Sequence, residues 1–461
     1  MNARMTWPLG LEMRLLLGIG ALFGVASILI VPPASVYDAP SHYFRALQVS
    51  EGTLHPEKYS ERAAGGMLPR GHVEFVNTLW GQYWAQHSFG SPREWDGLSK
   101  KFAADTDRAR VEFTNTSVYS PANYVFQSVG IRLSMAFGNS PIRAHRTACL
   151  FNLGGYLLIV AAAIGRLPRY QKGFLLAATT PLNLWQAASV SADAINFAIP
   201  LLLFAWILHL RSETSAKPLR GVAVAMGIGM LLALLKPNAI VLLASLLFIP
   251  GRCFGRGPVK YWVLAPYFLC AVGLWLAWNH ANLTIDIARW YQPELPDMSV
   301  QKQYFISHPL SFVPPFFRFI IHGLPDQLAP AYATVGAVIP ESVYRGLAYL
   351  ALVFAVGFVA CPSWEGRADW MWSAGMLLQS LAILVAIALA LWLALGHPAD
   401  PMIPGFGGRY LPVPIFCASL AWAEASHRGL PRLRNGLFWM AIGANCAALT
   451  VMISSIASRV L

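Results

Sequence analysis

The fold is decided by residues 15–31, which read LLLGIGALFGVASILIV. This uncharged run has the length of about 17–25 residues that a helix needs to cross a bilayer. Arg4 and Arg14 precede the run, and Pro32-Pro33 ends it. A basic start, an apolar middle and a small-residue end are also typical of a cleaved signal peptide. Because the run is long for a signal core and many apolar runs follow, we predict a retained first span that leaves the cytoplasm.

The composition places the whole chain in a membrane. Of 461 residues, 56% are hydrophobic and 12% are charged, against roughly 25% charged in ordinary soluble domains. The net charge of +12 does not indicate a nucleic-acid partner, because the basic residues lie in short gaps between apolar runs, as the positive-inside rule expects. We therefore expect a lipid bilayer, and no nucleic acid, among the partners.

The basic gaps also orient the chain. Residues 33–145 form the longest polar stretch, and within it Tyr119–Phe137 is apolar enough to be a span or a helix on the membrane surface. If this segment lies on the surface, Ala148–Ile164 crosses back inward and the later basic gaps fall in the cytoplasm. Those gaps contain Arg166, Arg169, Lys172, Arg211, Lys217, Arg220, Arg252, Arg256, Lys260, Arg428, Arg432 and Arg434. We therefore predict a surface helix, and 33–145 as a first extracytoplasmic loop.

The hydropathy pattern predicts an all-α polytopic membrane protein with about eleven transmembrane helices in one domain, 1–461. Besides the first two, the spans are predicted at 173–188, 193–210, 221–235, 238–250, 260–280, 344–361, 372–395, 410–425 and 436–457. The short, proline-bounded spans 173–188 and 238–250 are expected to be broken or tilted. A second large extracytoplasmic loop is predicted at 281–343, with a surface helix at Phe316–Gly323. A third outer loop is predicted at 396–408.

Under this topology two acids lie at the outer rim of the bilayer. Asp38, just beyond the first span, has the chemistry of a general base or a metal ligand. It could also be a solvated loop acid or a helix N-cap, because aspartate before a proline-containing helix start suits capping. Asp193 lies between two apolar runs, and its spacing favours an N-cap for the span that begins at Ala194. The residues alone leave both interpretations open.

Basic residues gather at the same rim. Lys236, at the end of an apolar run, must snorkel or pair because a charge there is costly. Arg409 stands on the side where the positive-inside rule disfavours arginine, and arginine binds phosphate oxygens in a planar, bidentate manner. Gly407 and Gly408 before it are expected to let the backbone approach a ligand. Arg146, clustered with Arg143 and His145, could bind lipid headgroups or a substrate.

In this order, these residues resemble a bacterial family of membrane proteins filed as domain of unknown function 2142, within the GT-C superfamily of lipid-phosphate-sugar-dependent glycosyltransferases. The matching pieces are Asp38–His42, Gly65-Gly66, Tyr119–Pro121 with Tyr124, Arg146 with Asn152, Ser189–Asp193, Lys236, Gly323–Asp326 and Gly408–Tyr410. One departure matters: the family pattern usually has an acidic pair where this chain has Asp38-Ala39. A role of the second acid, in binding metal or acceptor, is then missing or moved.

The resemblance implies a GT-C-like enzyme in the bacterial inner membrane. It would transfer a sugar, with inversion, from a polyprenyl-phosphate donor to a cell-envelope glycan or lipid on the outer, periplasmic face, in polysaccharide biosynthesis. Asp38 would be the catalytic base, and a divalent metal is possible but no cofactor is certain. The phosphate would bind Arg409, Lys236 and Tyr410, and the substrate would also contact His42, Tyr119, Arg146 and Asp193. The alternatives are a transporter or flippase of lipid-linked saccharides, and a noncatalytic partner in envelope assembly.

Overall fold

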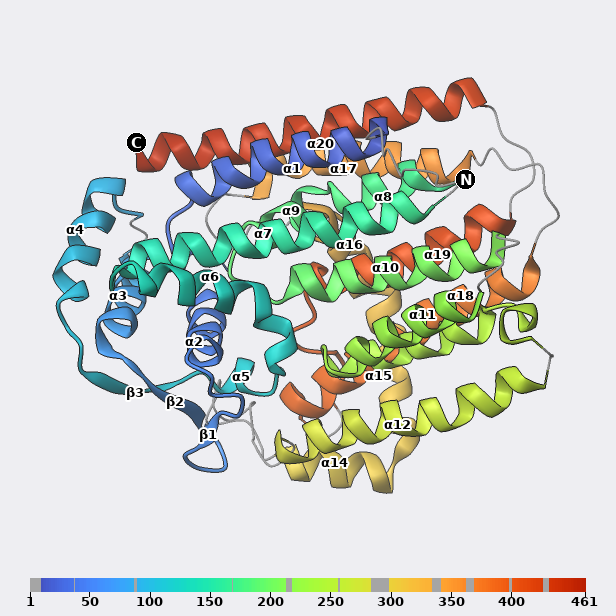
Figure 1. Cartoon of the computed structure of the whole chain (residues 1–461), viewed down its shortest axis with the longest axis horizontal. Coiled ribbons are helices and arrows are strands. Elements are labelled where there is room, and N and C mark those ends of the chain that lie inside the picture. Colours follow the sequence, from blue (N-terminus) through green and yellow to red (C-terminus); the bar gives the residue numbers. More distant parts are fainter. Residues whose placement is uncertain are drawn as a thin grey trace, which may run out of the picture.

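The described part of the chain is mostly helical, and its long helices lie side by side with roughly parallel axes (Figure 1). The computed structural model describes residues 10–36, 38–86, 89–167, 169–212, 218–255, 258–282, 298–333, 341–361, 369–397, 400–425 and 431–461. The positions of Arg4, Lys217, Arg256 and Arg428, and parts of the predicted outer loops 281–343 and 396–408, lie outside these residues.

Six described helices are long and apolar enough to cross a membrane. They are α1 (Leu11–Ile30), α7 (Pro141–Arg166), α10 (Asp193–Ser212), α12 (Val259–Asn282), α18 (Trp370–Leu395) and α20 (Pro431–Val460). The other predicted spans correspond to shorter helices. Among these are α11 (Pro218–Ala233), the 3-10 helix Pro237–Phe248, the apolar part Arg345–Ala360 of α17 (Glu341–Ala360), and α19 (Pro412–Ala425). A mainly α-helical membrane protein is thus confirmed, while the count of eleven spans stays a prediction.

The predicted span 173–188 consists of two short helices, α8 (Gln171–Ala178) and α9 (Pro181–Ala187). Proline begins α9 because its fixed φ suits the first helical turn, and the Thr180 side chain accepts a hydrogen bond from the Asn183 N–H. The predicted span 238–250 is a 3-10 helix rather than an α-helix. Both segments lie against α10. In the apolar 18-residue stretch of α10 that could cross a membrane, 72% of the residues are buried inside the protein. The broken elements therefore lie inside the bundle, where neighbouring side chains can bind their free backbone groups.

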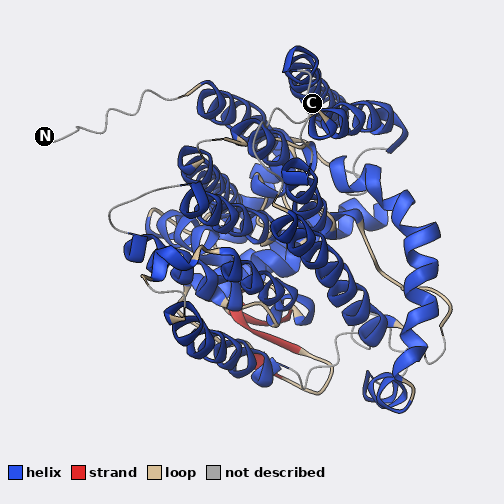
Figure 2. Ribbon diagram, turned by 90° about the vertical axis from the view of Figure 1, so that its right-hand side faces the viewer, coloured by secondary structure: helices blue, strands red, loops and turns tan. Residues whose placement is uncertain are grey.

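One end of the bundle carries the elements of the first loop (Figure 1). They are α2 (Ala39–Ser50), β1 (Glu57–Lys58), β2 (Ala64–Pro69), α3 (Arg70–Gln86), α4 (Pro92–Ala103), β3 (Arg108–Glu112), α5 (Thr114–Ser117) and α6 (Val125–Ala136). The strands form one small antiparallel sheet, in the order β1-β2-β3 (Figure 2). The sequence analysis did not predict this sheet. It is short, and β2 contains Gly65-Gly66, which has low strand propensity.

The predicted surface segment Tyr119–Phe137 contains α6 and the 3-10 turn Pro121–Tyr124. At 12 residues, α6 rises about 18 Å, too little to cross a hydrocarbon core of about 30 Å. Its exposed apolar side chains are spaced four residues apart, at Val125, Val129, Leu133 and Phe137. A helix with an apolar stripe on one face and its other face against protein suits the membrane surface.

The predicted surface helix Phe316–Gly323 also has one exposed apolar face and one face packed against protein. It comprises the end of α15 (Val313–Arg318) and the π-helical turn Phe319–Gly323, and it leads into α16 (Leu324–Ala333). Phe317 and Ile321 are exposed, whereas Phe316 and Phe319 are buried in a cluster with Trp392 of α18.

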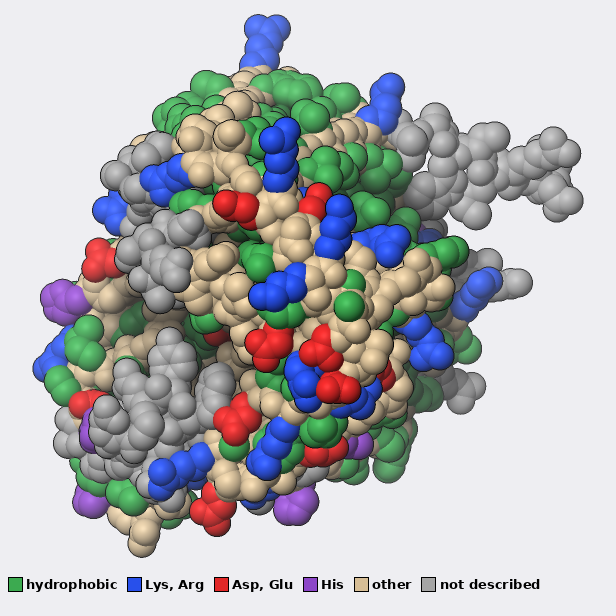
Figure 3. All heavy atoms as spheres, turned by 90° about the vertical axis from the view of Figure 1, so that its left-hand side faces the viewer, with side chains coloured by type: hydrophobic (Ala, Val, Ile, Leu, Met, Phe, Trp, Pro, Cys, Tyr) green, Lys and Arg blue, Asp and Glu red, His purple; other side chains and the backbone are tan. Residues whose placement is uncertain are grey.

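The two ends of the bundle differ in their polar groups. The face built from the first loop shows acidic and basic side chains intermingled (Figure 3), including the exposed ion pairs Arg70–Asp107 and Arg108–Glu51. α10 begins beneath this region at Asp193 and ends at the opposite end of the bundle, near Arg211. Arg252 donates a hydrogen bond to the Arg211 carbonyl, so this next basic gap lies at the same end, away from the first loop, as the predicted topology requires.

Candidate functional site

Five predicted site residues meet where helices begin beneath the first loop. Asp38 immediately precedes α2, and Asp193 is the first residue of α10. Lys236 immediately precedes the 3-10 helix Pro237–Phe248, while Arg409 and Tyr410 lie just before α19. At the start of a helix, packing of the bundle holds the backbone in place, but the side chain does not have to pack in the apolar core. This architecture brings polar groups from four distant segments to one place.

Asp38 binds Arg409 rather than capping its own helix. Asp38 is the N-cap residue of α2, with φ 57° in the left-handed region, and its side chain makes no capping hydrogen bond. Instead Asp38 Oδ2 accepts a hydrogen bond from Arg409 Nη1 at 2.9 Å, and Oδ1 accepts one from Asn115 Nδ2 at 3.2 Å. A non-glycine residue in this backbone region is uncommon and costs of order 1 kcal/mol or more. The surrounding structure therefore favours the ion pair over the cap.

Asp38 is ionised at neutral pH in this arrangement. Burial raises the pKa of its carboxyl, but the charge and hydrogen bond of the Arg409 guanidinium outweigh burial, and the pKa lies below its ordinary value. The carboxylate is thus deprotonated, but it has little tendency to accept a proton while Arg409 is bound to it.

Asp193 and Lys236 form a second, more buried ion pair. α10 begins at Asp193, as the predicted span 193–210 does, so Asp193 is its first residue rather than an N-cap before Ala194. Asp193 Oδ1 accepts a hydrogen bond from Lys236 Nζ, and the two side chains are only 12% and 15% exposed. Lys236 therefore pairs inside the protein and does not snorkel outward.

Tyrosine rings join the two ion pairs. Lys236 Nζ lies 5.4 Å from the centre of the Tyr119 ring and 5.6 Å from that of Tyr410. The Arg409 guanidinium lies 5.3 Å from the same Tyr410 ring, and its Nη2 contacts the Tyr410 hydroxyl oxygen at 3.4 Å. Such cation–π contacts stabilise partly desolvated cations. The two cations thus share one aromatic side chain and form a single electrostatic unit.

His42, from the first turn of α2, lies beside this unit. Its Nδ1 is 2.7 Å from the Tyr124 hydroxyl oxygen, and its ring stacks on Tyr119 with centres 6.1 Å apart. Burial lowers the pKa of His42 from 6.5 to about 4. The imidazole is therefore neutral at physiological pH and serves as a hydrogen-bonding and stacking group.

The neutrality of His42 predicts a loss of stability in acid. Between pH 6.5 and about 4, the unfolded chain binds a proton on this histidine that the folded chain does not, so lowering the pH favours unfolding. The pKa difference corresponds to about 3 kcal/mol. We expect His42→Asn, which keeps an acceptor near Nδ1, to lose less stability than wild type between pH 7 and pH 4. Thermal unfolding of both proteins in detergent, at pH 7 and at pH 4, measures the difference. An equal loss of stability in the two proteins would contradict a neutral, buried His42.

A network of asparagines, which the sequence analysis missed, fixes the position of Lys236. Asn196 Oδ1 accepts a hydrogen bond from the Lys236 backbone N–H at 3.0 Å, and Asn196 Nδ2 donates to Asn123 Oδ1 at 2.8 Å. Asn123 in turn donates to the Leu234 carbonyl. A polar residue inside an apolar run is the signal that would have pointed to Asn196. Asn152 of α7 similarly donates to carbonyls just before Asp193.

Gly408 has a different role from the predicted one. A Cβ at this position would lie 2.4 Å from the Ala331 nitrogen and 2.5 Å from the Pro330 carbonyl carbon. The close approach is therefore to the backbone of α16 and not to a ligand. At Gly407 the nearest atom to such a Cβ would be Arg409 Cγ, at 4.0 Å.

Gly408→Ala is consequently expected to destabilise the protein by about 1–3 kcal/mol, because the backbone of α16 has to shift. Gly407→Ala, one residue away, is the matched control and is expected to unfold at nearly the wild-type temperature. Thermal unfolding of the two purified variants makes the comparison. Equal unfolding temperatures for both would contradict this role of Gly408.

Arg146 is the predicted site residue that the structure does not bring into this cluster. Its neighbour His145 packs against Tyr43 of α2, with ring centres 5.4 Å apart, and contacts Cys149 Sγ at 3.7 Å. The contacts of the described residues do not connect Arg146 with Asp38 or Arg409. α7 instead supports the site through Asn152.

The cluster borders a small cavity of about 60 Å³. Asp193, Lys236, Arg409 and Tyr410 line it, together with Asn183, Gln186, Asn196 and Asn238 among other residues. The two acids of the cluster, Asp38 and Asp193, balance the charge of its two cations, Lys236 and Arg409. An incoming anion must therefore compete with the two carboxylates for these cations. In the described part of the chain, no three His, Cys, Asp or Glu side chains gather closely enough to hold a metal ion.

The bundle and its buried charges define the class: this is a multi-pass membrane protein with a polar cluster at one end. The model of a family described as a predicted membrane protein, DUF2142, matches residues 21–417, and the chain belongs to this family. No curated protein and no solved structure matches the chain.

Proposed function

We propose that the protein is an inverting membrane glycosyltransferase of the GT-C type, with about eleven spans. It would move a sugar from a polyprenyl-phosphate donor to a glycan or lipid acceptor of the cell envelope, on the outer face of the bacterial inner membrane. The observation that carries the proposal is the meeting of Asp38–Arg409 and Asp193–Lys236 beside a cavity at one end of a membrane bundle. Charges that are buried within a membrane protein are costly and usually mark a functional site.

The two cations suit a phosphate leaving group. Arg409 provides several N–H donors in a planar fork, and Lys236 adds a second positive charge beside the same Tyr410 ring. Groups that are held in place before the reaction stabilise developing charge without reorganisation. As the bond between the sugar C1 and the phosphate oxygen breaks, the bonding electrons stay on the phosphate, next to these cations.

Asp38 is the base in this proposal. The acceptor hydroxyl oxygen attacks C1 of the sugar from the face opposite the phosphate, and its proton passes to the Asp38 carboxylate. One displacement inverts the anomeric centre and needs no covalent enzyme intermediate. His42 and Tyr119, which stack on each other near Asp38, would contact the sugar or the acceptor, and Asp193 would hold Lys236 in place.

The Asp38–Arg409 pair gives this mechanism a resting state. While Arg409 binds Asp38, the carboxylate has a depressed pKa and little tendency to accept a proton. A donor phosphate that competes for Arg409 would weaken the pair and raise the pKa of Asp38 towards its ordinary value. Donor binding would therefore activate the base.

The test is transfer by the purified protein, reconstituted in liposomes with a labelled polyprenyl-phosphate sugar and a mixture of envelope acceptors. Formation of a labelled acceptor with the inverted anomer, together with release of polyprenyl phosphate, is the expected result. Movement of the donor between leaflets without chemistry would instead identify a flippase. If no donor in a panel is moved between leaflets or used for sugar transfer, the result would favour a noncatalytic assembly partner.

A further inference from the structure

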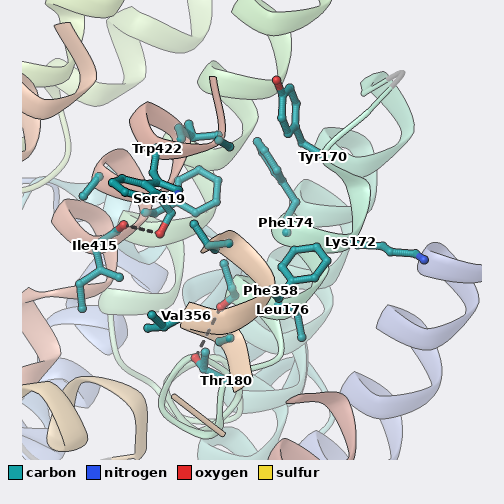
Figure 4. Close-up of a pocket in the computed structure, with 18 of the residues that line it drawn as sticks. Tyr170, Lys172, Phe174, Leu176, Thr180, Val356, Phe358, Ile415, Ser419 and Trp422 are labelled. Carbon is teal, nitrogen blue, oxygen red and sulfur yellow. Dashed lines mark hydrogen bonds between the residues drawn. The ribbon is translucent and has the colours of Figure 1, made fainter. Parts of the chain in front are cut away.

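A second and much larger cavity, of about 780 Å³, lies between α8, α17 and α19 (Figure 4). Its walls are mostly apolar and include Phe174, Phe358 and Phe416. This volume falls within the range of about 300–1,000 Å³ that is typical of ligand sites. The charged residues of the Asp38–Arg409 cluster do not line it, although Asn183 and Pro412 border both cavities.

The cavity opens sideways towards the bilayer. Val356 of α17 and Trp422 of α19 both line it, and they are 59% and 54% exposed. In a membrane bundle, exposed apolar side chains in these positions face lipid tails. The opening therefore admits a ligand from the membrane.

The cavity follows most of the length of α19. Pro412 and Ala423 both line it and are 11 residues apart on this helix, which corresponds to about 16 Å along the helix axis. An acyl chain whose headgroup lies at the Ala423 end would thus extend along α19 towards Pro412.

The end of the cavity away from the Asp38–Arg409 cluster is basic. Arg169, Lys172 and Arg434 line it there, with Glu12 as the single acid among these lining residues, which gives a net charge of +2. The Arg434 guanidinium lies 4.3 Å from the centre of the Phe358 ring, which is itself part of the cavity wall. Its charge therefore lies directly at the apolar space.

The basic end is a structured junction of two helix starts. Lys172, in the first turn of α8, donates a hydrogen bond from Nζ to Asn435 Oδ1 of α20 at 2.6 Å and lies 4.9 Å from the Phe438 ring centre. The N-termini of α8 and α20 thus meet at this point, and the partial positive charge of a helix N-terminus adds to that of the side chains.

We propose that this cavity binds one anionic phospholipid. Its phosphate would contact Arg169, Lys172 and Arg434, and an acyl chain would fill the space between α8, α17 and α19. Basic pockets between transmembrane helices are known to hold anionic headgroups of the cytoplasmic leaflet, which is the leaflet at this end in the predicted topology. The site does not depend on the proposed glycosyltransferase activity.

Native mass spectrometry of the detergent-purified, delipidated protein tests the proposal. The probes are phosphatidylglycerol and phosphatidylcholine with identical acyl chains. We expect one phosphatidylglycerol to bind at least tenfold more tightly than phosphatidylcholine. Equal binding of the two lipids overturns the proposal. So does displacement of the lipid by millimolar inorganic phosphate, or occupation by a polyprenyl phosphate but not by phosphatidylglycerol.

Variants test the basic end of the cavity and its apolar space separately. Lys172→Gln combined with Arg434→Gln is expected to reduce phosphatidylglycerol binding at least tenfold. Arg432→Gln is the matched control, because Arg432 lies in the same turn of α20, is exposed and does not line the cavity. Ala418→Phe leaves every charge in place but fills the apolar space, and it is also expected to reduce binding. Wild-type binding by both the double variant and Ala418→Phe refutes the site.

Discussion

Replacement of Asp38 by asparagine is expected to lower the rate of sugar transfer by about 10²- to 10⁴-fold, the range typical of a lost general base. Asparagine has nearly the same shape, and its oxygen can still accept the hydrogen bond from Arg409 or Asn115 that the carboxylate accepts now. It also tolerates the left-handed backbone of this position. The substitution therefore removes the proton acceptor with little other change. Initial rates of transfer from a labelled polyprenyl-phosphate sugar measure the effect.

Asp107→Asn is the control for this experiment. Asp107 also belongs to the first loop and also binds an arginine, Arg70, at 2.9 Å, but its side chain is 69% exposed. Its replacement is expected to leave the rate unchanged. A normal rate for Asp38→Asn would remove Asp38 from the mechanism, and an equal loss in both variants would indicate a general effect of charge in the first loop.

The second large effect concerns the buried pair Asp193–Lys236. Lys236→Met keeps the length of the side chain but leaves the Asp193 carboxylate buried without its cation. Breaking a buried ion pair in this way costs about 3–5 kcal/mol, so we expect a large fall in the unfolding temperature in detergent. The double variant Asp193→Asn, Lys236→Met carries no unpaired charge and is expected to recover most of the stability.

Activity separates the structural role of Lys236 from its proposed role in binding phosphate. The double variant should fold but transfer sugar poorly, because the second cation is absent. Arg70→Met, which breaks the exposed pair with Asp107, is the control and should cost no more than about 1 kcal/mol. If the double variant transferred sugar at the wild-type rate, Lys236 would have a structural role only.

The hydropathy pattern predicted the long helices well, because a span needs a run of apolar residues that is visible in sequence. α1, α7 and α18 all overlap their predicted ranges, and the proline-bounded run 173–188 is broken at Pro181 as expected. The sheet was not predicted. Its strands are two to six residues long and depend on pairing across the first loop, which leaves no long alternating pattern.

Most residues of the cluster were predicted, but Arg146 was wrongly included, Asn196 was missed, and the pairing was not predicted. Charged residues at the ends of apolar runs pointed to Asp38, Asp193 and Lys236, because such positions are costly unless they have partners. Which acid binds which cation depends on the packing of helices distant in sequence. For the same reason, the contact of Gly408 with α16 could not be seen in the local pattern of glycines.

The two ion pairs also differ in when they can form during synthesis. Lys236 follows Asp193 by 43 residues, whereas Arg409 follows Asp38 by 371. At roughly 5–20 residues per second, a ribosome needs roughly 20–75 s to make the longer interval. The nascent chain therefore inserts most of its helices before Arg409 exists. A polypeptide terminated before Arg409 would carry the acid without its arginine, so the site is complete only after residues 38–409 have been translated.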